Sequence, residues 1–185
     1  NSILYLKYLS SSSNSLKNYI DGVLKFFKSD ISIKDRKEKI KISEFIDEIK
    51  KLTDPEQKVH FEIENQVKMI TTNKSALTQI FNNLITNAIK YNSKPNKQIH
   101  IKISENNTDY ELSVTDNGDG IPEEHLSKVF DLFSIVGVLD NEGNIGTGLG
   151  LSTVKKIINR LDGEVKVTSK LGEGSTFNFS ISKIE

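Results

Sequence analysis

The sequence predicts an α+β fold, a two-layer α/β sandwich with three helices on a mixed, mostly antiparallel sheet and a long helix in front. Two kinds of periodicity predict it. Apolar residues recur every three or four positions in residues 75–91 and 149–161, the spacing of amphipathic helices. Apolar and polar residues alternate in residues 59–64, 98–104 and 110–116, the pattern of half-buried strands. Packing such helices on such strands gives the α+β class.

Residues 1–29 have the apolar seam of a helical hairpin or coiled coil. The seam positions alternate spacings of three and four and are Leu6, Leu9, Ser13, Leu16, Ile20, Val23 and Phe27. Because one apolar stripe needs a partner to cover it, we expect a dimerisation helix; the alternative is an amphipathic helix packed on its own domain. Residues 30–38 are polar and are interpreted as a linker, so that residues 39–185 form the main domain.

The main domain is expected to begin with a short strand at residues 41–42 and a helix over residues 43–52, with Ser43 as its N-cap. Residues 68–71 are expected to pair with the strand at residues 59–64. The later elements are a hairpin of residues 98–104 and 110–116, a short helix over residues 123–133, the helix of residues 149–161, and strands over residues 164–169 and 175–182.

The bulk composition excludes several function classes. The chain has 25 basic and 25 acidic residues, and its formal net charge is zero. It therefore lacks the excess of positive charge that is typical of proteins that bind nucleic acid. The absence of cysteine excludes disulfides and thiolate metal sites and favours a reducing compartment. No apolar run approaches the ~20 residues that span a bilayer, and no secretory signal is found. We therefore expect a cytoplasmic domain of a longer protein, whether or not that protein is anchored in a membrane.

The glycines are concentrated in one part of the chain. Ten of the eleven lie between residues 118 and 174, most of them in clusters at residues 116–121, 146–152 and 172–177. Glycine lets the backbone approach a ligand closely and adopt positive φ angles. The clusters predict a nucleotide pocket built largely from main chain; the alternative for each cluster is an ordinary turn.

Polar side chains form a stripe beside the apolar face of the predicted helix 75–91. Asn83 and Asn87 are four residues apart, and Lys90 and Tyr91 follow one turn later. Amide oxygens can ligate a hard cation such as magnesium, and lysine supplies a point charge for phosphate. The alternative is a polar face that is simply solvated.

Two further segments have the chemistry of a nucleotide site. Asp116 ends a predicted strand, where its carboxylate can accept hydrogen bonds from an exocyclic amine; the alternative is a plain Asp-Asn-Gly turn. Residues 146–151 lead into a helix, whose N-terminal N–H groups attract anions, with neither Rossmann nor P-loop spacing. Residues 134–145 contain two glycines and are interpreted as a mobile lid, or alternatively as a surface loop.

Order and spacing of these segments resemble the sensor histidine kinases. The five motifs are residues 83–91 (NLITNAIKY) for the N box, 116–120 (DNGDG) for the G1 box, 129–133 (VFDLF) for the F box, 146–151 (GTGLGL) for the G2 box, and 172–177 (GEGSTF) for the last glycine motif. The resemblance covers roughly residues 39–185 and implies the Bergerat ATP-binding fold of the GHKL superfamily, which includes gyrase and the heat-shock chaperone ATPases.

The resemblance also implies roles for individual residues. Asn87 would coordinate Mg²⁺ with support from Asn83, Lys90 would contact phosphate, Asp116 would bind the adenine amino group, and Thr176 would lie beneath the adenine near Asp116. Asn83 and Lys90 are the implied catalytic residues. The implied ATP-binding residues are Asn83, Asn87, Lys90, Tyr91, Asp116, Gly118, Gly120, Ile121, Phe133, Gly146, Thr147, Gly148, Leu149, Gly150, Leu151 and Thr176.

Two features depart from the family pattern. None of His60, His100 and His125 has the surroundings of the family's phosphoacceptor, so we expect no phosphoacceptor in this chain. The F box is followed by residues 134–136 (SIV) rather than by a basic residue, which leaves Lys90 and Lys128 as the cations for the γ-phosphate.

The function implied by the resemblance is transfer of the ATP γ-phosphoryl group to a histidine on a helical hairpin outside this chain. The implied partners are that hairpin, a response-regulator receiver domain, and a second copy bound through the N-terminal helix. An ATP-driven clamp is disfavoured because Asn83 stands where such enzymes have a glutamate that activates water. The alternatives kept open are a GHKL serine kinase and a nucleotide-binding or dimerisation module without autokinase activity.

Overall fold

The computed structural model describes residues 37–135 and 146–183, together with eight single residues between Tyr5 and Leu24. All eight are helical, and the apolar side chains of Tyr5, Leu9, Leu16, Ile20 and Leu24 are exposed. The predicted seam positions Leu6 and Phe27 and residues 30–36 of the predicted linker lie outside the described residues. The dimerisation role of this segment stays a prediction.

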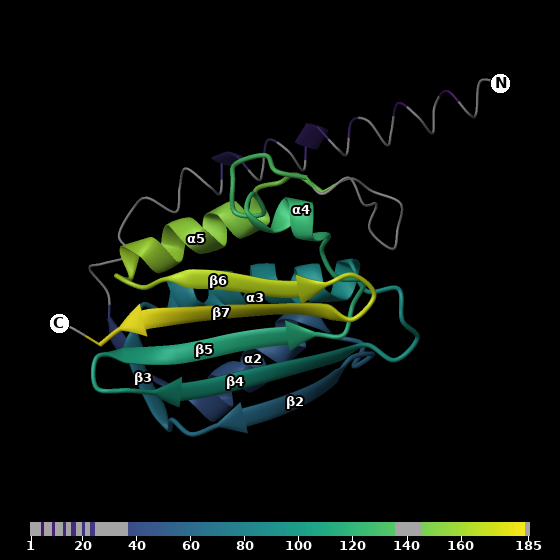
Figure 1. Cartoon of the computed structure of the whole chain (residues 1–185). Helices are drawn as coiled ribbons and strands as arrows, with labels where there is room; N and C mark the ends of the chain where they lie inside the picture. Colours follow the sequence, from purple (N-terminus) through teal and green to yellow (C-terminus); the bar gives the residue numbers. More distant parts are fainter. Residues whose placement is uncertain are drawn as a thin grey trace.

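A five-stranded sheet forms one layer of the fold (Figure 1). Its strands, in spatial order, are β2 (His60–Asn65), β4 (Gln98–Glu105), β5 (Asp109–Asp116), β7 (Gly174–Ser182) and β6 (Val165–Lys170). The β2–β4 pair is parallel and the other three pairs are antiparallel. The predicted mixed, mostly antiparallel sheet is therefore confirmed.

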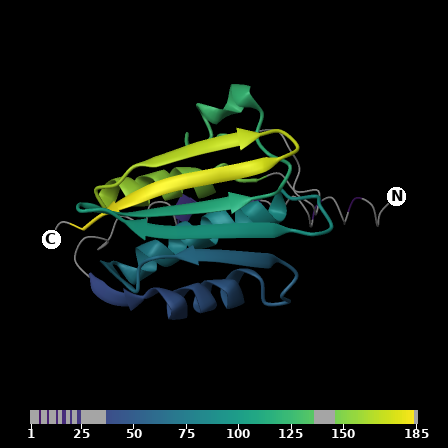
Figure 2. The same ribbon diagram turned by 60° about the horizontal axis from the view of Figure 1, so that its bottom comes forward.

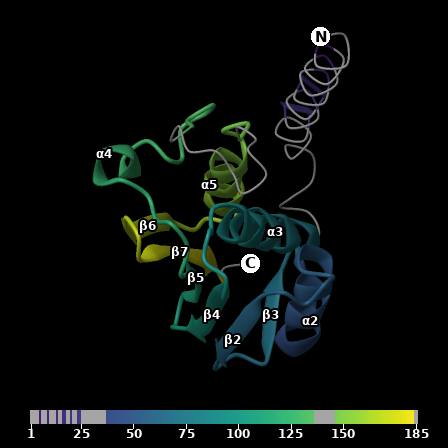
Figure 3. The same ribbon diagram turned by 90° about the vertical axis from the view of Figure 1, so that its right-hand side faces the viewer.

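The second layer consists of helices on one face of this sheet. Helices α3 (Lys74–Lys90) and α5 (Gly150–Arg160) lie side by side on that face, as the side view in Figure 3 shows. Helix α2 (Ile42–Thr53) packs next to α3 on the side of the β2 edge (Figure 2). In the described part of the chain, the other face of the sheet carries no helix, and no helix is both long and apolar enough to span a membrane.

The core lies between the two layers because strand residues alternate between the two faces. Ile99, Ile101 and Ile103 of β4 are fully buried under α3, whose inner face presents Leu77, Ile80, Phe81 and Leu84. The Phe81 ring packs edge-on against Phe45 of α2, with ring centroids 5.4 Å apart, and against Phe179 of β7 at 5.8 Å. This packing fixes the rotation of α3, so that its polar stripe faces away from the sheet.

A second, two-stranded sheet corrects three predictions about the start of the domain. Strand β1 (Glu38–Lys41) pairs antiparallel with β3 (Met69–Thr72), so residues 68–71 do not pair with β2. Strand β1 ends at Lys41, so the strand expected at residues 41–42 lies before Ile42, which already belongs to α2. Lys41 rather than Ser43 is the N-cap of α2, without a side-chain cap, because Ile42 is already helical and buried in the core.

The predicted helix over residues 123–133 is shorter in the structure. Helix α4 (Glu123–Leu126) is followed by turns. Successive N–H groups of His125, Lys128 and Asp131 bond to the carbonyl three residues back, so no continuous α-helical ladder forms. Val129 is buried within this turn region, which brings the segment onto the domain instead of extending α4 into solvent.

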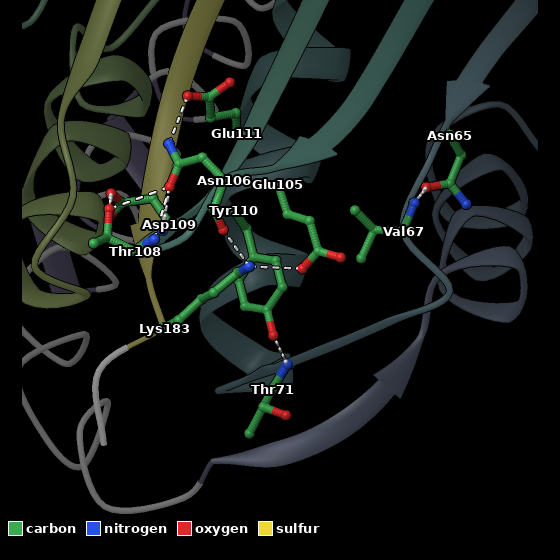
Figure 4. A network of polar contacts seen from close by, with 10 residues as sticks. All are labelled: Asn65, Val67, Thr71, Glu105, Asn106, Thr108, Asp109, Tyr110, Glu111 and Lys183. Carbon is green, nitrogen blue, oxygen red and sulfur yellow. Dashed lines mark hydrogen bonds and ion pairs between the residues drawn. The ribbon is translucent and has the colours of Figure 1, made fainter.

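Polar contacts hold together the end of the sheet at the β4–β5 turn (Figure 4). The Asn106 amide oxygen accepts hydrogen bonds from the N–H groups of Thr108 and Asp109, at 2.9 and 2.7 Å, and closes the β4–β5 turn. The Lys183 ammonium lies 2.7 Å from the Glu105 carboxylate and 5.1 Å from the centre of the Tyr110 ring. These contacts fasten the end of β7 to the β4–β5 hairpin.

Candidate functional site

The polar stripe on α3 lies next to the beginning of α5. Asn83 and Asn87 are half-buried and Lys90 is exposed. A Cβ atom at Gly150, the first residue of α5, would lie 3.7 Å from the Asn87 amide nitrogen and 3.9 Å from its oxygen. The predicted metal-binding amide and the predicted phosphate-binding helix terminus are therefore neighbours in space.

Tyr91, the C-cap of α3, makes a second contact with the same glycine-rich segment. A Cβ atom at Gly146 would lie 2.5 Å from the Tyr91 hydroxyl oxygen, so any larger residue there would displace the Tyr91 side chain. Asn87 and Tyr91, one turn apart, thus lie along residues 146–150. Thr147 is half-buried, Leu149 is buried and Leu151 is half-buried at the start of α5, so this segment is packed onto the domain.

Residues 129–133 end against the same segment. The backbone N–H of Phe133 donates a 3.0 Å hydrogen bond to the carbonyl oxygen of Gly148. Gly148 has φ +67°, and a Cβ there would lie 2.5 Å from the Phe133 carbonyl carbon. The Phe133 side chain is 50% exposed. Residues 136–145 of the predicted lid lie outside the described residues, and the two described ends of that segment meet at this contact.

Asp116 lies at the end of β5, at the edge of the helical layer. Its carboxylate accepts a 2.8 Å hydrogen bond from the Gly118 N–H and another from the Ser175 N–H. Burial raises the pKa of Asp116 above its usual range, and these two N–H groups oppose the rise only in part. A half-buried carboxylate with oxygen lone pairs left over is suited to accept a hydrogen bond from a ligand amine.

Residues 116–121 form a turn that needs glycine at its tightest point. Gly120 has φ +74°, and a Cβ there would lie 2.2 Å from the Lys170 carbonyl oxygen. Gly118 is buried, and the half-buried Ile121 donates its N–H to the Ser169 hydroxyl at 2.8 Å. The predicted loop of main chain around Asp116 is therefore present, closed by the β6–β7 turn.

The structure corrects the position of Thr176. The Thr176 hydroxyl lies 3.0 Å from the Thr115 hydroxyl, on the face of the sheet that carries no described helix. Strand register pairs Asp116 with Ser175, and Ser175 is 7% exposed on the helical side. Because neighbouring strand residues point to opposite faces, Ser175 and not Thr176 has its side chain on the side of Asp116. The sequence could have revealed this, because Phe177, Phe179 and Ile181 are apolar at every second position and Ser175 continues the same series.

The histidines and acidic residues give no second candidate centre. Among residues 37–135 and 146–183, no group of three histidine, aspartate or glutamate side chains is placed to hold a metal ion. His100 lies 3.9 Å from Glu64, across β2 and β4, and His125 lies 3.7 Å from Glu124 in α4. The expectation that none of them is a phosphoacceptor stays a prediction.

The arrangement suits an elongated ligand with an amine at one end and anionic groups at the other. Asp116 provides the acceptor for the amine. The N-terminus of α5, preceded by the glycines of residues 146–150, provides N–H groups for anions. The amides of Asn83 and Asn87 lie on the helix that leads from one end to the other and carry oxygens of the kind that magnesium prefers.

Comparison with known proteins agrees with this arrangement. Residues 72–184 match the family model described as "Histidine kinase-, DNA gyrase B-, and HSP90-like ATPase". A curated relative, the sensor protein SrrB of Staphylococcus aureus strain MRSA252, is 41% identical over 115 residues, which cover 62% of this chain and 20% of SrrB. The chain therefore spans about a fifth of the length of this relative.

Two solved structures have the same fold. The nucleotide-free catalytic domain of the histidine kinase ThkA is 27% identical, with a TM-score of 0.66 over 80% of this chain and 96% of that domain. Full-length ShkA in complex with AMPPNP is 22% identical, with a TM-score of 0.76 over 96% of this chain and 38% of ShkA. The family match covers more than half of the chain and contains every predicted site residue, so the chain belongs to the histidine kinase-, DNA gyrase B- and HSP90-like ATPase family.

Proposed function

We propose that this domain binds Mg-ATP and transfers the γ-phosphoryl group to a histidine, as the catalytic domain of a two-component sensor histidine kinase. The observation that carries the proposal is the contact of Asn87 and Tyr91 with the glycine-rich segment before α5. It brings the Asn87 amide next to the N-terminus of α5, and Asn83 and the exposed Lys90 lie on the same helix as Asn87. The similarity to the sensor protein SrrB favours a sensor kinase over the other members of the family.

The adenine is assigned to the Asp116 end of the site. The Asp116 carboxylate accepts from the 6-amino group, and Gly118, Gly120 and Ile121 line the base pocket. Ser175 takes the place first expected for Thr176, because its side chain lies on the side of Asp116. The phosphates extend toward residues 146–151 and Phe133, where backbone N–H groups and the N-terminus of α5 favour negative charge.

The residues around Asn87 fit a magnesium ion. Amide oxygens are suitable ligands, and the lack of a side chain at Gly150 leaves room beside the Asn87 amide. Asn87 would hold the ion, with Asn83 in support. When bound, magnesium neutralises charge on the phosphate oxygens. Lys90, exposed at the end of α3, adds a positive charge for the γ-phosphate.

The transfer step needs no strong base in this chain. A nitrogen of the target imidazole attacks the γ-phosphorus, the bond from phosphorus to the β,γ-bridging oxygen breaks, and ADP leaves with that electron pair. The imidazole is itself the nucleophile. Asn83 cannot take a proton from water, so it does not promote hydrolysis of the bound ATP. Catalysis is then positioning by Asn83 and charge neutralisation by Lys90.

The partners follow from this role. The phosphoacceptor is a helical hairpin of the same or a second protomer, and a receiver domain of a response regulator accepts the phosphoryl group from it. The exposed apolar side chains of Leu9, Leu16 and Ile20 support dimerisation through the N-terminal helix. We assign the domain to the cytoplasm, where ATP is available.

The experiment mixes this chain with a separate phosphoacceptor hairpin of a sensor histidine kinase and ATP labelled at the γ-phosphate. Acid-labile label on the hairpin is the expected result. Acid-stable phosphoserine identifies a serine kinase instead. Nucleotide binding without any transfer identifies a binding module, and the proposed activity is then wrong.

A further inference from the structure

The turn that carries Asp116 is fastened to the end of α3 by the side chains of Asn92 and Asn117, to which the family resemblance assigns no role. Asn92, directly after Tyr91, is 0% exposed. Its amide nitrogen donates a 2.8 Å hydrogen bond to the amide oxygen of Asn117, the residue directly after Asp116. A buried polar side chain is tolerated where its hydrogen bonds are made, so this pair has one defined geometry.

Asn117 is also held by the start of β4. Its amide oxygen accepts a second hydrogen bond, 2.9 Å from the N–H of Gln98, and its amide nitrogen donates to the Asn96 carbonyl at 3.0 Å. Both lone pairs of the Asn117 amide oxygen are therefore used. The Asn92 amide oxygen accepts in turn from the Lys94 N–H at 3.1 Å. Together the two amides connect three segments: the end of α3, the start of β4 and the turn after β5.

The same turn is also bonded to Tyr91 and Ser93, the residues on either side of Asn92. The Asp119 N–H donates to the Tyr91 carbonyl at 3.0 Å, and the Asp119 carboxylate accepts from the Ser93 N–H at 3.1 Å. The neighbouring Gly118 N–H is the one that bonds to Asp116. A shift of the turn therefore moves the Asp116 carboxylate relative to Tyr91.

We propose that Asn92 and Asn117 are positioning residues, whose amide pair sets the place of the Asp116 carboxylate and with it the preference for a purine that carries a 6-amino group. This inference rests on the proposed function, because it takes Asp116 as the residue that binds the amine. Neither asparagine needs to touch the nucleotide. Each acts through the turn.

The test compares the affinities for ADP and IDP, which differ in the 6-amino group, in the wild-type chain and in matched variants. Asn92→Ala and Asn117→Ala are each expected to lower the ADP-to-IDP affinity ratio by about tenfold, the effect of losing one hydrogen bond to a charged group. The double variant is expected to lose no more than Asn117→Ala alone, because both changes break one pair. Asn117→Asp keeps an oxygen that can accept from Asn92 and Gln98. Its ADP-to-IDP affinity ratio is therefore expected to be closer to the wild-type ratio than that of Asn117→Ala.

The matched control is Asn106→Ala at the other end of β4 and β5. Asn106 also closes a turn with its amide, by accepting from Thr108 and Asp109 (Figure 4), but this turn precedes β5, whereas Asp116 is at the other end of that strand. It is expected to lower the melting temperature while leaving the ADP-to-IDP ratio unchanged. A wild-type ratio in both Asn92→Ala and Asn117→Ala, with only a loss of melting temperature, overturns the inference and reduces the pair to a structural role.

A second measurement separates this inference from the proposed function. Hydrogen exchange in the nucleotide-free chain is expected to be faster at the Gly118 and Asp119 amides in Asn92→Ala and Asn117→Ala, but not in Asn106→Ala. Unchanged exchange at both amides also overturns the inference. If the wild-type chain binds neither ADP nor IDP, the proposed function is wrong, and the exchange rates alone decide whether Asn92 and Asn117 hold the turn.

Discussion

The Phe133 N–H bonds to the Gly148 carbonyl oxygen at 3.0 Å and joins the two described ends of the segment predicted to be a lid. The contact depends on a glycine with φ +67° at position 148. The hydrogen bond therefore holds the residue before the predicted lid next to the residues that follow it.

Gly148→Ala is predicted to destabilise the domain more than Gly172→Ala. Both glycines have positive φ, +67° and +80°, so both substitutions cost about 1–2 kcal/mol of backbone strain. A Cβ at position 148 also lies 2.5 Å from Phe133, whereas nothing lies within 4 Å of one at position 172. Overpacking adds ~1–3 kcal/mol at position 148 only. Urea unfolding measures both, and equal free energies of unfolding would contradict the Phe133 contact.

Asn87→Ala is predicted to abolish the magnesium-dependent part of nucleotide affinity. The amide oxygen that holds the ion is lost, while Asp116 still binds the base. Calorimetric titration with ATP in magnesium and in EDTA measures how much magnesium increases the affinity for ATP. We expect this increase to be at least tenfold smaller in the variant, which is about 1.4 kcal/mol of binding free energy. Asn82→Ala is the matched control on the same helix, outside the stripe of Asn83 and Asn87. Unchanged magnesium dependence in Asn87→Ala would count against the proposed metal ligand.

Asp116→Asn is predicted to make the domain relatively more stable as the pH rises from 3 to 7. Burial raises the pKa of Asp116 in the folded state, so the folded protein holds this proton more tightly than the unfolded chain. The contribution of this proton to the stability of the domain is fully present below about pH 3.9, the pKa of aspartate in the unfolded chain. It is lost as the pH rises through the pKa of Asp116 in the folded state. Asparagine carries no charge and avoids this loss.

The measurement is the difference in melting temperature between Asp116→Asn and the wild type at pH 3 and pH 7. The difference is expected to shift in favour of the variant at pH 7, where the variant also loses its preference for ADP over IDP. A difference that does not change with pH would show that the carboxylate is not penalised by burial.

Ser175→Val is predicted to weaken ATP binding, whereas Thr176→Val leaves it unchanged. Ser175 lies beside Asp116 and 2.9 Å from the Ser169 hydroxyl, which in turn accepts the Ile121 N–H. Valine at position 175 removes these polar contacts and adds volume on the base side of the sheet. Valine at position 176 replaces a hydroxyl that bonds to Thr115 on the other face. Competition binding of ATP analogues distinguishes the two, and the reverse order of effects would restore Thr176 to the site.

Sequence periodicity predicts most of the fold because burial is decided locally in these elements. The alternation in residues 98–104 and 110–116 and the helical spacing in residues 75–91 correspond to β4, β5 and α3. The pairing of β1 with β3 was not predictable in the same way. The alternation of apolar and polar residues in Met69–Thr72 shows which face is buried, but it does not show which neighbouring strand the segment pairs with. Likewise the N-cap signal at Ser43 was overridden by burial of Ile42 and Phe45.

Motif order predicts which segments meet at the site, but not how their side chains are oriented. Asn87, Tyr91 and residues 146–150 come together as expected. The choice between Ser175 and Thr176 depends on strand register, which becomes fixed only when β5 and β7 pair. The Asn92–Asn117 contact joins residues 25 positions apart in loops that have no periodicity, so no local pattern reveals it.

The parallel pairing of β2 with β4 has a consequence for how the chain reaches its active form. Parallel neighbours need a crossover, and here that crossover contains α3 with Asn83 and Asn87. The helix can take its final position only after this long loop has closed, a slow step because the contacts it creates are distant in sequence. The antiparallel hairpins can form earlier without any competence to hold a nucleotide. Nucleotide binding therefore requires the β2–β4 crossover to be in place, and ATP, which binds only the chain with this crossover formed, shifts the folding equilibrium toward it.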